Sequence, residues 1–152
     1  MAKLQKLNKD ASKVMRAILA RIPEGDTAVK IADNDAYMPL CVERVDWWLG
    51  DILNAFPEYI KEKFAVSLCH YGEQNGDAMR DPEVVFLCYK IDDEWHYVPA
   101  TYRQDYYGVD REYIFVRDGR IVFNSAGQRD LKDFCNMWMK NLNEQQKILD
   151  AA

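Results

Sequence analysis

The sequence FAVSLCHYGEQNGDAMRDPEVVFLCYKI, residues 64–91, places two β-rich runs on either side of a turn signal. Asn75-Gly76 is typical of a tight hairpin turn, in which both central residues take a positive φ. The second run, residues 83–91, is apolar on both faces, which is typical of a strand in the middle of a sheet. These residues therefore predict an antiparallel hairpin at the centre of a β-sheet.

The turn also fixes which residues of the hairpin face each other. Counting outward from a two-residue turn places Tyr71 opposite Arg80 and His70 opposite Asp81. Side chains that face each other across an antiparallel pair stand about 4.5–5.5 Å apart at Cβ. His70 and Asp81 are therefore expected to share a hydrogen bond, in which the carboxylate orients the imidazole and raises its pKa. They are the candidate catalytic residues.

Regular hydrophobic patterns continue before this hairpin. Apolar residues recur every three or four positions in residues 4–22 and 45–56, which predicts two amphipathic helices. Residues 27–32 and 37–42 have the length and β-branched content of strands. Pro39 in the second run favours an edge position or a bulge, because proline cannot donate to the ladder.

The second half of the chain carries two further signals. Asp118-Gly119 lies between β-rich runs and predicts another hairpin, and Ser125 followed by Gln128 predicts a capped C-terminal helix. Residues 1–152 are therefore expected to form a single α+β domain. Its antiparallel sheet should have about five to six strands, with N-terminal and C-terminal helices packed on one face. Residues 46–63 are a candidate insertion.

Composition places the chain among ordinary globular proteins. Of its 152 residues, 49% are hydrophobic and 30% are charged, and no apolar run approaches the ~20 residues of a membrane span. The basic N-terminus lacks the apolar segment of a signal peptide, so we expect a cytoplasmic protein without membrane contact. The four scattered cysteines are expected to be buried free thiols, and no cofactor is expected.

Net charge limits the class of partner. The formal charge of −5 argues against a dedicated nucleic-acid-binding protein, whose footprint is normally basic, but it leaves room for a local basic patch. An inhibitor that acts through an acidic face would need a contiguous negative patch. The partner is therefore left open as an unknown protein or nucleic acid.

The polar residues of the first hairpin contain the ingredients of a hydrolytic site. His70, Glu73, Asp77 and Asp81 supply an imidazole and hard oxygen ligands that suit Mg²⁺, Mn²⁺ or Ca²⁺. Strand alternation opposes this hypothesis, because His70 and Glu73 point to opposite faces of a regular strand. The sequence also contains no zinc-protease, serine-hydrolase, P-loop or dinucleotide-binding motif.

The alternative to a hydrolytic site is a recognition surface formed by the hairpin and a tyrosine-rich segment that follows it in the chain. The segment ATYRQDYYGVDREY, residues 100–113, mixes tyrosines and charges that suit base stacking or a protein contact. If the segment is buried instead, Arg103 and Asp105 are expected to form a salt bridge. The candidate binding residues of this segment and of the hairpin are Tyr71, Glu73, Asp77, Arg80, Tyr102, Arg103, Asp105 and Tyr106.

Two adjacent tryptophans bear on self-association. Trp47 and Trp48 follow each other in a predicted helix, so both cannot face the same core. Trp47 is therefore expected to be partly exposed or to cover a second contact surface. The expected oligomeric state is a monomer or a weak homodimer.

The hairpin carries the run H-Y-G-E-Q-N-G-D-x-M-R-D-P-E. Three other segments accompany it: YMPLCVE from residue 37, P-x-x-Y-R-x-D-Y at residues 99–106, and FCNMWMKNLNEQ at residues 134–145. Together they resemble an uncharacterised domain family found in bacterial plasmids, phages and integrative conjugative elements. The resemblance covers residues 30–145 and implies a cytoplasmic accessory protein of a mobile genetic element. It supplies no activity and no catalytic residues.

Geometry separates the two hypotheses that remain. A small binding module needs the hairpin residues exposed near Tyr102 and Tyr106. A metal-assisted hydrolase or nuclease needs His70 and the nearby carboxylates to converge in a concave pocket. The binding module is the preferred hypothesis, because the aromatic residues suit recognition and no second catalytic motif accompanies His70.

Overall fold

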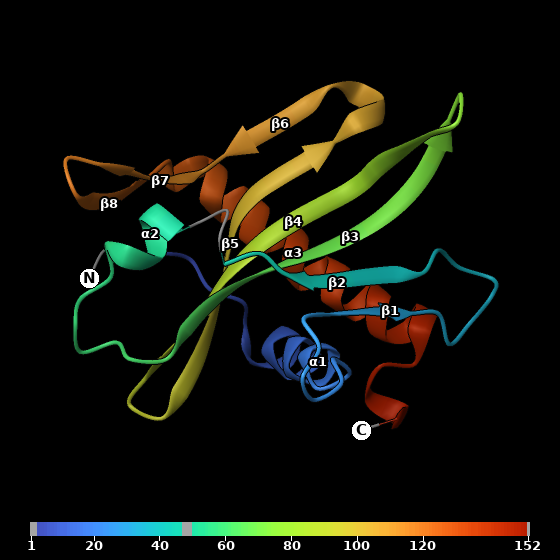
Figure 1. The fold of residues 1–152 in the computed structure, drawn as a ribbon, viewed down its shortest axis with the longest axis horizontal. Helices are drawn as coiled ribbons and strands as arrows, with labels where there is room; N and C mark the ends of the chain where they lie inside the picture. The colour runs from blue at the N-terminus through green and yellow to red at the C-terminus, as the bar shows by residue number, and fades with distance from the viewer. Residues whose placement is uncertain (1–2, 47–49, 152) are drawn as a thin grey trace.

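Six antiparallel strands form one sheet in the order in which they occur along the chain. The structure is a computed structural model that describes residues 3–46 and 50–151. The six strands are β1 (Ala28–Ile31), β2 (Leu40–Arg44), β3 (Lys63–Gln74), β4 (Asp77–Ile91), β5 (Glu94–Gln104) and β6 (Val109–Glu112). The long β3–β4 hairpin lies at the centre of the sheet, as predicted (Figure 1).

The two terminal helices cover one face of this sheet. Helices α1 (Lys9–Leu19) and α3 (Ser125–Gln146) bury apolar stripes in a common core with alternate residues of the central strands. Val66, Leu68 and Phe86, for example, are all less than 1% exposed in this core. The predicted α+β class and the packing of both terminal helices on one face are confirmed.

A second core lies on the opposite face, which agrees with the apolar residues on both faces of the run 83–91, although the elements that cover this face were not predicted. Helix α2 (Gly50–Asn54) and the two-stranded sheet of β7 (Ile114–Arg117) and β8 (Arg120–Phe123) pack there. They group at one end of the sheet (Figure 1). Toward the β3–β4 turn, the same face instead carries polar side chains of the central strands, among them Ser67, Glu83 and Arg103.

Both predicted hairpin turns have the backbone that their sequences require. Asn75 and Gly76 have φ values of 54° and 85°, and Asp118 and Gly119 have φ values of 53° and 74°. Two successive positive φ angles are the mark of the type I′ turn that suits the twist of paired strands. The turn residues thus determine where β3 passes into β4 and β7 into β8.

The predicted cap of the C-terminal helix is wrong by one residue. Asn124 is the N-cap of α3, and its side chain accepts a hydrogen bond from the backbone N–H of Gly127 at 3.0 Å. Gln128 is fully buried, and its side chain takes no part in the cap. Its amide instead binds the backbone of Gln5 and the carbonyl oxygen of Pro99, which ties the N-terminal segment to the sheet.

The predicted boundaries differ most in residues 37–56. The strand expected at 37–42 starts only at Leu40, after Pro39, and α2 accounts for residues 50–54 of the expected helix 45–56. The expected exposure of Trp47, and self-association through it, lie outside the described residues. That residues 46–63 are an insertion stays a prediction. Within that segment, Phe56 and Ile60 are buried in the second core.

The described residues contain no helix with both the length and the apolar composition needed to cross a bilayer.

Candidate functional site

The candidate site lies at the turn end of the β3–β4 hairpin. Tyr71 is the Cα partner of Arg80, as predicted. Between this pair and the pair of Cys69 with Glu83, β4 has one residue more than β3, so the register shifts at a β-bulge. His70 therefore faces the bulged part of β4 rather than one partner.

His70 and Asp81 bind different partners, so the predicted hydrogen bond between them is wrong. Nδ1 of His70 lies 2.9 Å from the carbonyl oxygen of Pro39 and must be the donor, because a carbonyl only accepts. His70 is 7% exposed, and its ring makes a T-shaped contact with Trp138 at 5.8 Å between centroids. Asp81 accepts a hydrogen bond from Nε2 of Gln104. His70 is thus part of the core under α3.

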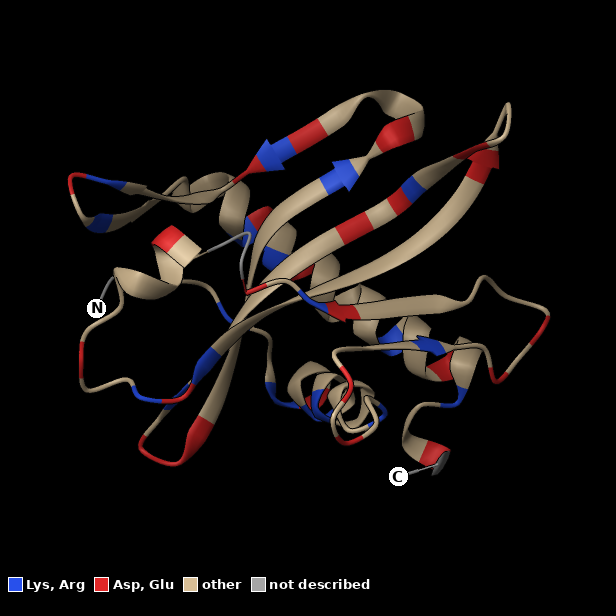
Figure 2. Cartoon of the chain, viewed as in Figure 1, with Lys and Arg blue, Asp and Glu red and all other residues tan. Residues whose placement is uncertain are grey.

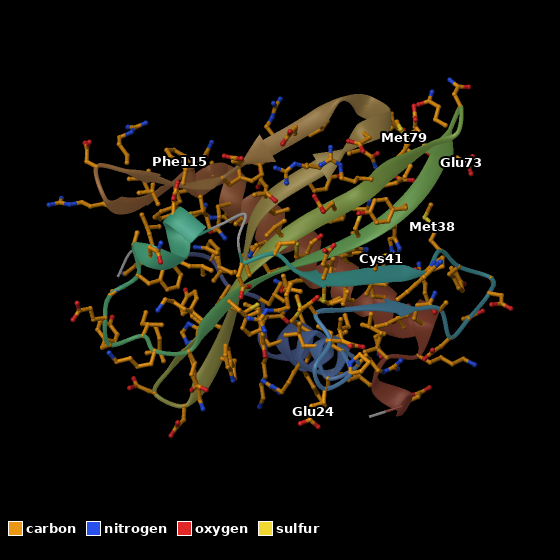
Figure 3. The ribbon with its side chains drawn as sticks, in the orientation of Figure 1. Glu24, Met38, Cys41, Glu73, Met79 and Phe115 are labelled. Carbon is orange, nitrogen blue, oxygen red and sulfur yellow. The ribbon has the colours of Figure 1, made fainter. Side chains whose placement is uncertain are left out.

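The candidate metal ligands are not brought together. Glu73 and Asp77 are exposed beside the turn, whereas His70 is buried on the helix-covered face. Figure 3 shows Glu73 near the tip of the hairpin. Across residues 3–46 and 50–151, no three His, Cys, Asp or Glu side chains are arranged to hold a metal ion. The sites proposed for His70, Glu73, Asp77 and Asp81 therefore lack a common centre.

Arg80 and Asp105 lock the β5–β6 connection onto β4. Oδ2 of Asp105 accepts two hydrogen bonds from Arg80, one from the backbone N–H at 2.7 Å and one from Nε at 3.0 Å. Oδ1 of Asp105 accepts a third, from Nη2 of Arg80, at 3.0 Å. These bonds from Arg80 lower the pKa of Asp105. Asp105 begins the short helix η1 (Asp105–Tyr107). Two candidate binding residues are therefore close together, as a pair that fixes the backbone.

A buried ion pair underlies the polar side of the sheet. Nη1 of Arg103 lies 3.4 Å from Oε1 of Glu83, and the two side chains are 5% and 8% exposed. Ser67 donates its hydroxyl to Oε2 of Glu83 at 2.8 Å, and Nη1 of Arg103 donates to Oγ1 of Thr101. Nε of Arg103 also lies 3.1 Å from Asp110. Replacing such a buried pair by apolar residues is often neutral, whereas removing one partner leaves a buried charge and is strongly destabilising.

The tyrosines of the expected recognition surface divide between two environments. Tyr71, Tyr106 and Tyr107 are 45%, 40% and 82% exposed. Tyr102 instead is half-buried and packs edge-on against Phe134 of α3, at 5.7 Å between centroids. Sequence reasoning had not selected Tyr107, although its position next to a glycine in a loop is a signal of exposure.

The contact of Tyr106 with the hairpin explains how η1 reaches β3. A Cβ atom on Gly72 would overlap the phenol group of Tyr106, so only glycine leaves room for this ring. The Tyr106 hydroxyl donates to the backbone carbonyl oxygen of Glu73 at 3.3 Å. Tyr106 and Asp105 therefore hold the loop after β5 against both strands of the hairpin.

Acidic side chains gather where these segments meet. We call residues 71–83 and 103–112 the hairpin end. Its carboxylates outnumber its guanidinium groups: Glu73, Asp77, Asp81, Glu83, Asp105, Asp110 and Glu112 against Arg80, Arg103 and Arg111. Figure 2 shows this excess on the β3–β4 tip and along the neighbouring β5–β6 connection. Most of the net negative charge of the chain lies there.

Two cysteines beside this end are unsuited to nucleophilic chemistry. Cys41 of β2 and Cys69 of β3 are Cα partners and line a shallow depression of about 410 Å³ with Tyr71. Burial raises the pKa of Cys69 to about 12 and also raises that of Cys41. Both thiols are therefore protonated near neutral pH, and the thiolate, which is the nucleophile, is scarce.

Comparison with known proteins assigns most of the chain to one family. No curated protein and no solved structure matches the chain. A family model matches residues 4–148, which include both terminal helices, all the strands and the hairpin end. The chain therefore belongs to the family described as a domain of unknown function, DUF6908.

Proposed function

We propose that this protein is a small binding module that holds a lysine- and arginine-rich protein segment at its hairpin end. The supporting observation is that three exposed tyrosines, Tyr71, Tyr106 and Tyr107, share this end with the excess of carboxylates. Tyrosine offers a large contact area at low conformational cost and is enriched in interfaces. The carboxylates around it attract cationic side chains and repel nucleic acid.

The rigidity of the hairpin end favours recognition. The Arg80–Asp105 pair and the packing of Tyr106 on Gly72 fix the η1 loop before any partner arrives. A surface ordered in advance loses less conformational entropy on binding, so more of the contact energy appears as affinity. Arg80 and Asp105 are positioning residues in this proposal, while Tyr107, Glu73 and Asp77 contact the partner.

The hydrolase hypothesis has lost its geometric basis. His70 binds Pro39 within the core, Asp81 binds Gln104, and Glu73 lies at the exposed tip. A general acid or base must lie within hydrogen-bonding reach of the group it serves. We therefore do not propose metal-assisted hydrolysis or nuclease activity for this chain.

The cellular setting belongs to the same proposal. The resemblance of the hairpin run to proteins of plasmids, phages and conjugative elements supports a role as an accessory protein of a bacterial mobile element. A cytoplasmic location agrees with the four unpaired thiols of the described residues, because disulfides form mainly in oxidising compartments. The partner in this setting would present a basic surface or tail.

Fluorescence anisotropy with two labelled peptides tests the binding activity. One peptide is rich in lysine and arginine, and the other has glutamate at each basic position. The wild type should bind the basic peptide, with an affinity that falls as salt rises, because exposed charges are screened. The Tyr107→Ala and Glu73→Lys variants should each weaken binding about tenfold without a change in thermal unfolding.

Matched controls lie elsewhere on the surface. Tyr59 is 64% exposed, and Glu24 lies on another edge of the molecule, as Figure 3 shows. Tyr59→Ala and Glu24→Lys make the same chemical changes and should leave binding unaltered. Equal losses in the control variants, or equal binding of both peptides, would refute the proposed role of the hairpin end.

A further inference from the structure

A stripe of cations runs along the solvent side of α1. Lys9, Lys13 and Arg16 have the i, i+4, i+7 spacing that places side chains on one side of a helix, and Lys6 precedes them. All four are exposed, while the opposite side of α1 is buried in the core. Helix α1 lies well away from the acidic hairpin end (Figure 2). The net charge of −5 therefore conceals two surfaces of opposite sign.

This stripe forms one wall of a groove. The groove has a volume of about 650 Å³, and its opposite wall is the start of β5, with Glu94 and Trp95. Four basic side chains line it against two acidic ones, Asp10 and Glu94. Glu94 pairs with Lys6 at 3.6 Å, but both side chains are well exposed, so a stronger anion can displace this contact.

Trp95 gives the groove an aromatic wall with a fixed orientation. Its ring stacks on Tyr97 at 6.5 Å between centroids, with an interplanar angle of 13°, and contacts Phe64 at 5.5 Å. Trp95 is only partly buried and borders the groove. A supported indole next to lysines provides a platform for a flat ring that is attached to an anion.

We propose that this groove binds single-stranded nucleic acid. Lys9, Lys13 and Arg16 would contact successive phosphates. Along the helix axis, Lys13 lies about 6 Å beyond Lys9, and Arg16 lies about 4.5 Å beyond Lys13. An unpaired base would stack on Trp95. This stacking requires a base that is not paired with a complementary strand. The groove thus joins the two features of sequence-independent strand binding, a basic track and a stacking side chain.

The proposal is separate from the function assigned to the hairpin end. It concerns another surface and a ligand of opposite charge, so either activity can fail without affecting the other. A protein with both would connect a nucleic-acid strand to a basic protein. The acidic hairpin end would also keep the strand in the groove, by repelling phosphates from the rest of the surface.

Anisotropy of labelled oligothymidylate, measured with the full chain over a series of salt concentrations, tests this proposal. Binding should be detectable at low salt and should weaken as salt rises, because phosphate contacts release counterions. The Lys9→Glu/Lys13→Glu variant should bind about tenfold more weakly and show a shallower salt dependence. Lys61→Glu/Arg120→Glu, which reverses two exposed charges elsewhere, should bind like the wild type.

Substitution of Trp95 distinguishes stacking from general attraction to anions. Trp95→Leu should weaken binding several-fold with an unchanged salt dependence, because stacking releases no counterions, and Trp95→Tyr should restore most of the affinity. Circular dichroism shows whether each variant is folded. Thymidine bases should also quench the fluorescence of the wild type, and this quenching should be smaller in Trp95→Leu.

Three results would overturn the proposal. The first is no binding at low salt, and the second is an equal loss in the two charge-reversed variants. The third is equal or tighter binding of a duplex, of heparin or of vesicles containing anionic lipid, together with no effect of Trp95→Leu. The third result would indicate a general polyanion surface instead of a strand-binding groove.

Discussion

The ring of Tyr106 occupies the space that a side chain on Gly72 would fill. Gly72→Ala should therefore displace the ring and the η1 loop, and lower the free energy of unfolding by about 1–3 kcal/mol, as expected for overpacking. Chemical denaturation measures this loss. Gly50→Ala is the control, since a Cβ there meets no atom within 4 Å, and it should change stability by less than about 1 kcal/mol.

A double-mutant cycle separates this clash from other effects of alanine. Gly72→Ala/Tyr106→Ala should be less destabilised than the sum of the two single changes, because the second substitution removes the ring that clashes. Additive losses would show that the ring and the glycine act independently, which contradicts the close approach.

The Arg80–Asp105 pair should make stability depend on pH in the acid range. Arg80 lowers the pKa of Asp105 in the folded state, so the contribution of the pair is complete above the unfolded pKa and is lost as the pH falls through the folded one. Asp105→Asn should cost about 1 kcal/mol near neutral pH, because the pair is partly exposed but multiply hydrogen-bonded. The difference from the wild type should shrink in acid.

Urea titrations at several pH values measure that difference. Asp35→Asn removes an exposed loop carboxylate and serves as the control, with no expected change in the pH profile. A constant gap between wild type and Asp105→Asn at every pH would mean that the loss arises from packing and not from the ion pair.

Loss of Arg103 should be far more damaging than loss of its neighbour Arg111. Arg103→Met leaves the buried carboxylate of Glu83 with only the more distant Arg80, whose Nη1 lies 3.8 Å away, and should cost about 3–5 kcal/mol. Arg111→Met, at an exposed position, should cost less than about 0.5 kcal/mol. Removing both charges in Glu83→Met/Arg103→Met should recover much of the loss in equilibrium unfolding. A double variant less stable than Arg103→Met would contradict a penalty due to unpaired charge.

The four cysteines should differ in their access to a thiol reagent. Cys41 is half-buried, whereas Cys69, Cys88 and Cys135 are buried. A disulfide reagent should therefore modify Cys41 first, slowly because its pKa is raised, and the other thiols only on unfolding. Cys41→Ser should abolish the first phase of the absorbance change. Rapid modification of a second thiol in that variant would contradict the buried positions.

Divalent metals should leave thermal unfolding unchanged. The candidate ligands His70, Glu73 and Asp81 lie apart, so Mg²⁺, Mn²⁺, Ca²⁺ and Zn²⁺ should give the same unfolding temperature as EDTA. A metal ion that binds only the folded state, at a concentration of about 100 times its Kd, would raise the free energy of unfolding by about 2.7 kcal/mol. Calorimetry detects a change of this size readily. A shift of that size that is lost in Glu73→Gln would restore the metal hypothesis.

Local signals were sufficient for much of the fold. Asn75-Gly76 and Asp118-Gly119 specify their turns through positive φ angles, which few residue pairs tolerate, and the apolar stripes of α1 and α3 repeat at helical spacing. The Tyr71–Arg80 register follows from the first turn by simple counting. These features depend on residues that are close together in the chain, so the sequence reveals them directly.

The contacts of His70 required information from a distant part of the chain. Its hydrogen-bond partner, Pro39, lies 31 positions earlier, and the bulge near Asp81 removes the expected facing pair. Counting residue pairs outward from the turn assumes a regular ladder, so it cannot reveal a bulge that inserts an extra residue into one strand. Strand propensities, in turn, do not indicate which loop supplies the hydrogen-bond partner of His70. A single irregularity in the ladder therefore changed the interpretation of the site.

Ion-pair partners were unpredictable for a related reason. Four charged residues, Arg80, Glu83, Arg103 and Asp105, allow several pairings, and the sequence favoured Arg103 with Asp105. The structure pairs Arg103 with Glu83 and Asp105 with Arg80, because neighbouring strands bring these groups to the same face. Only the strand order and the bulge determine which carboxylate each guanidinium meets.

The order of the strands has a consequence for synthesis on the ribosome. Each strand of the sheet pairs with its neighbour in the chain, so the meander can form as successive hairpins emerge. The bond between Gln5 and Gln128 spans 123 positions and can form only after the start of α3 has been made. Until then the apolar face beneath α3 is uncovered, and we expect the nascent chain to need protection from aggregation during that interval.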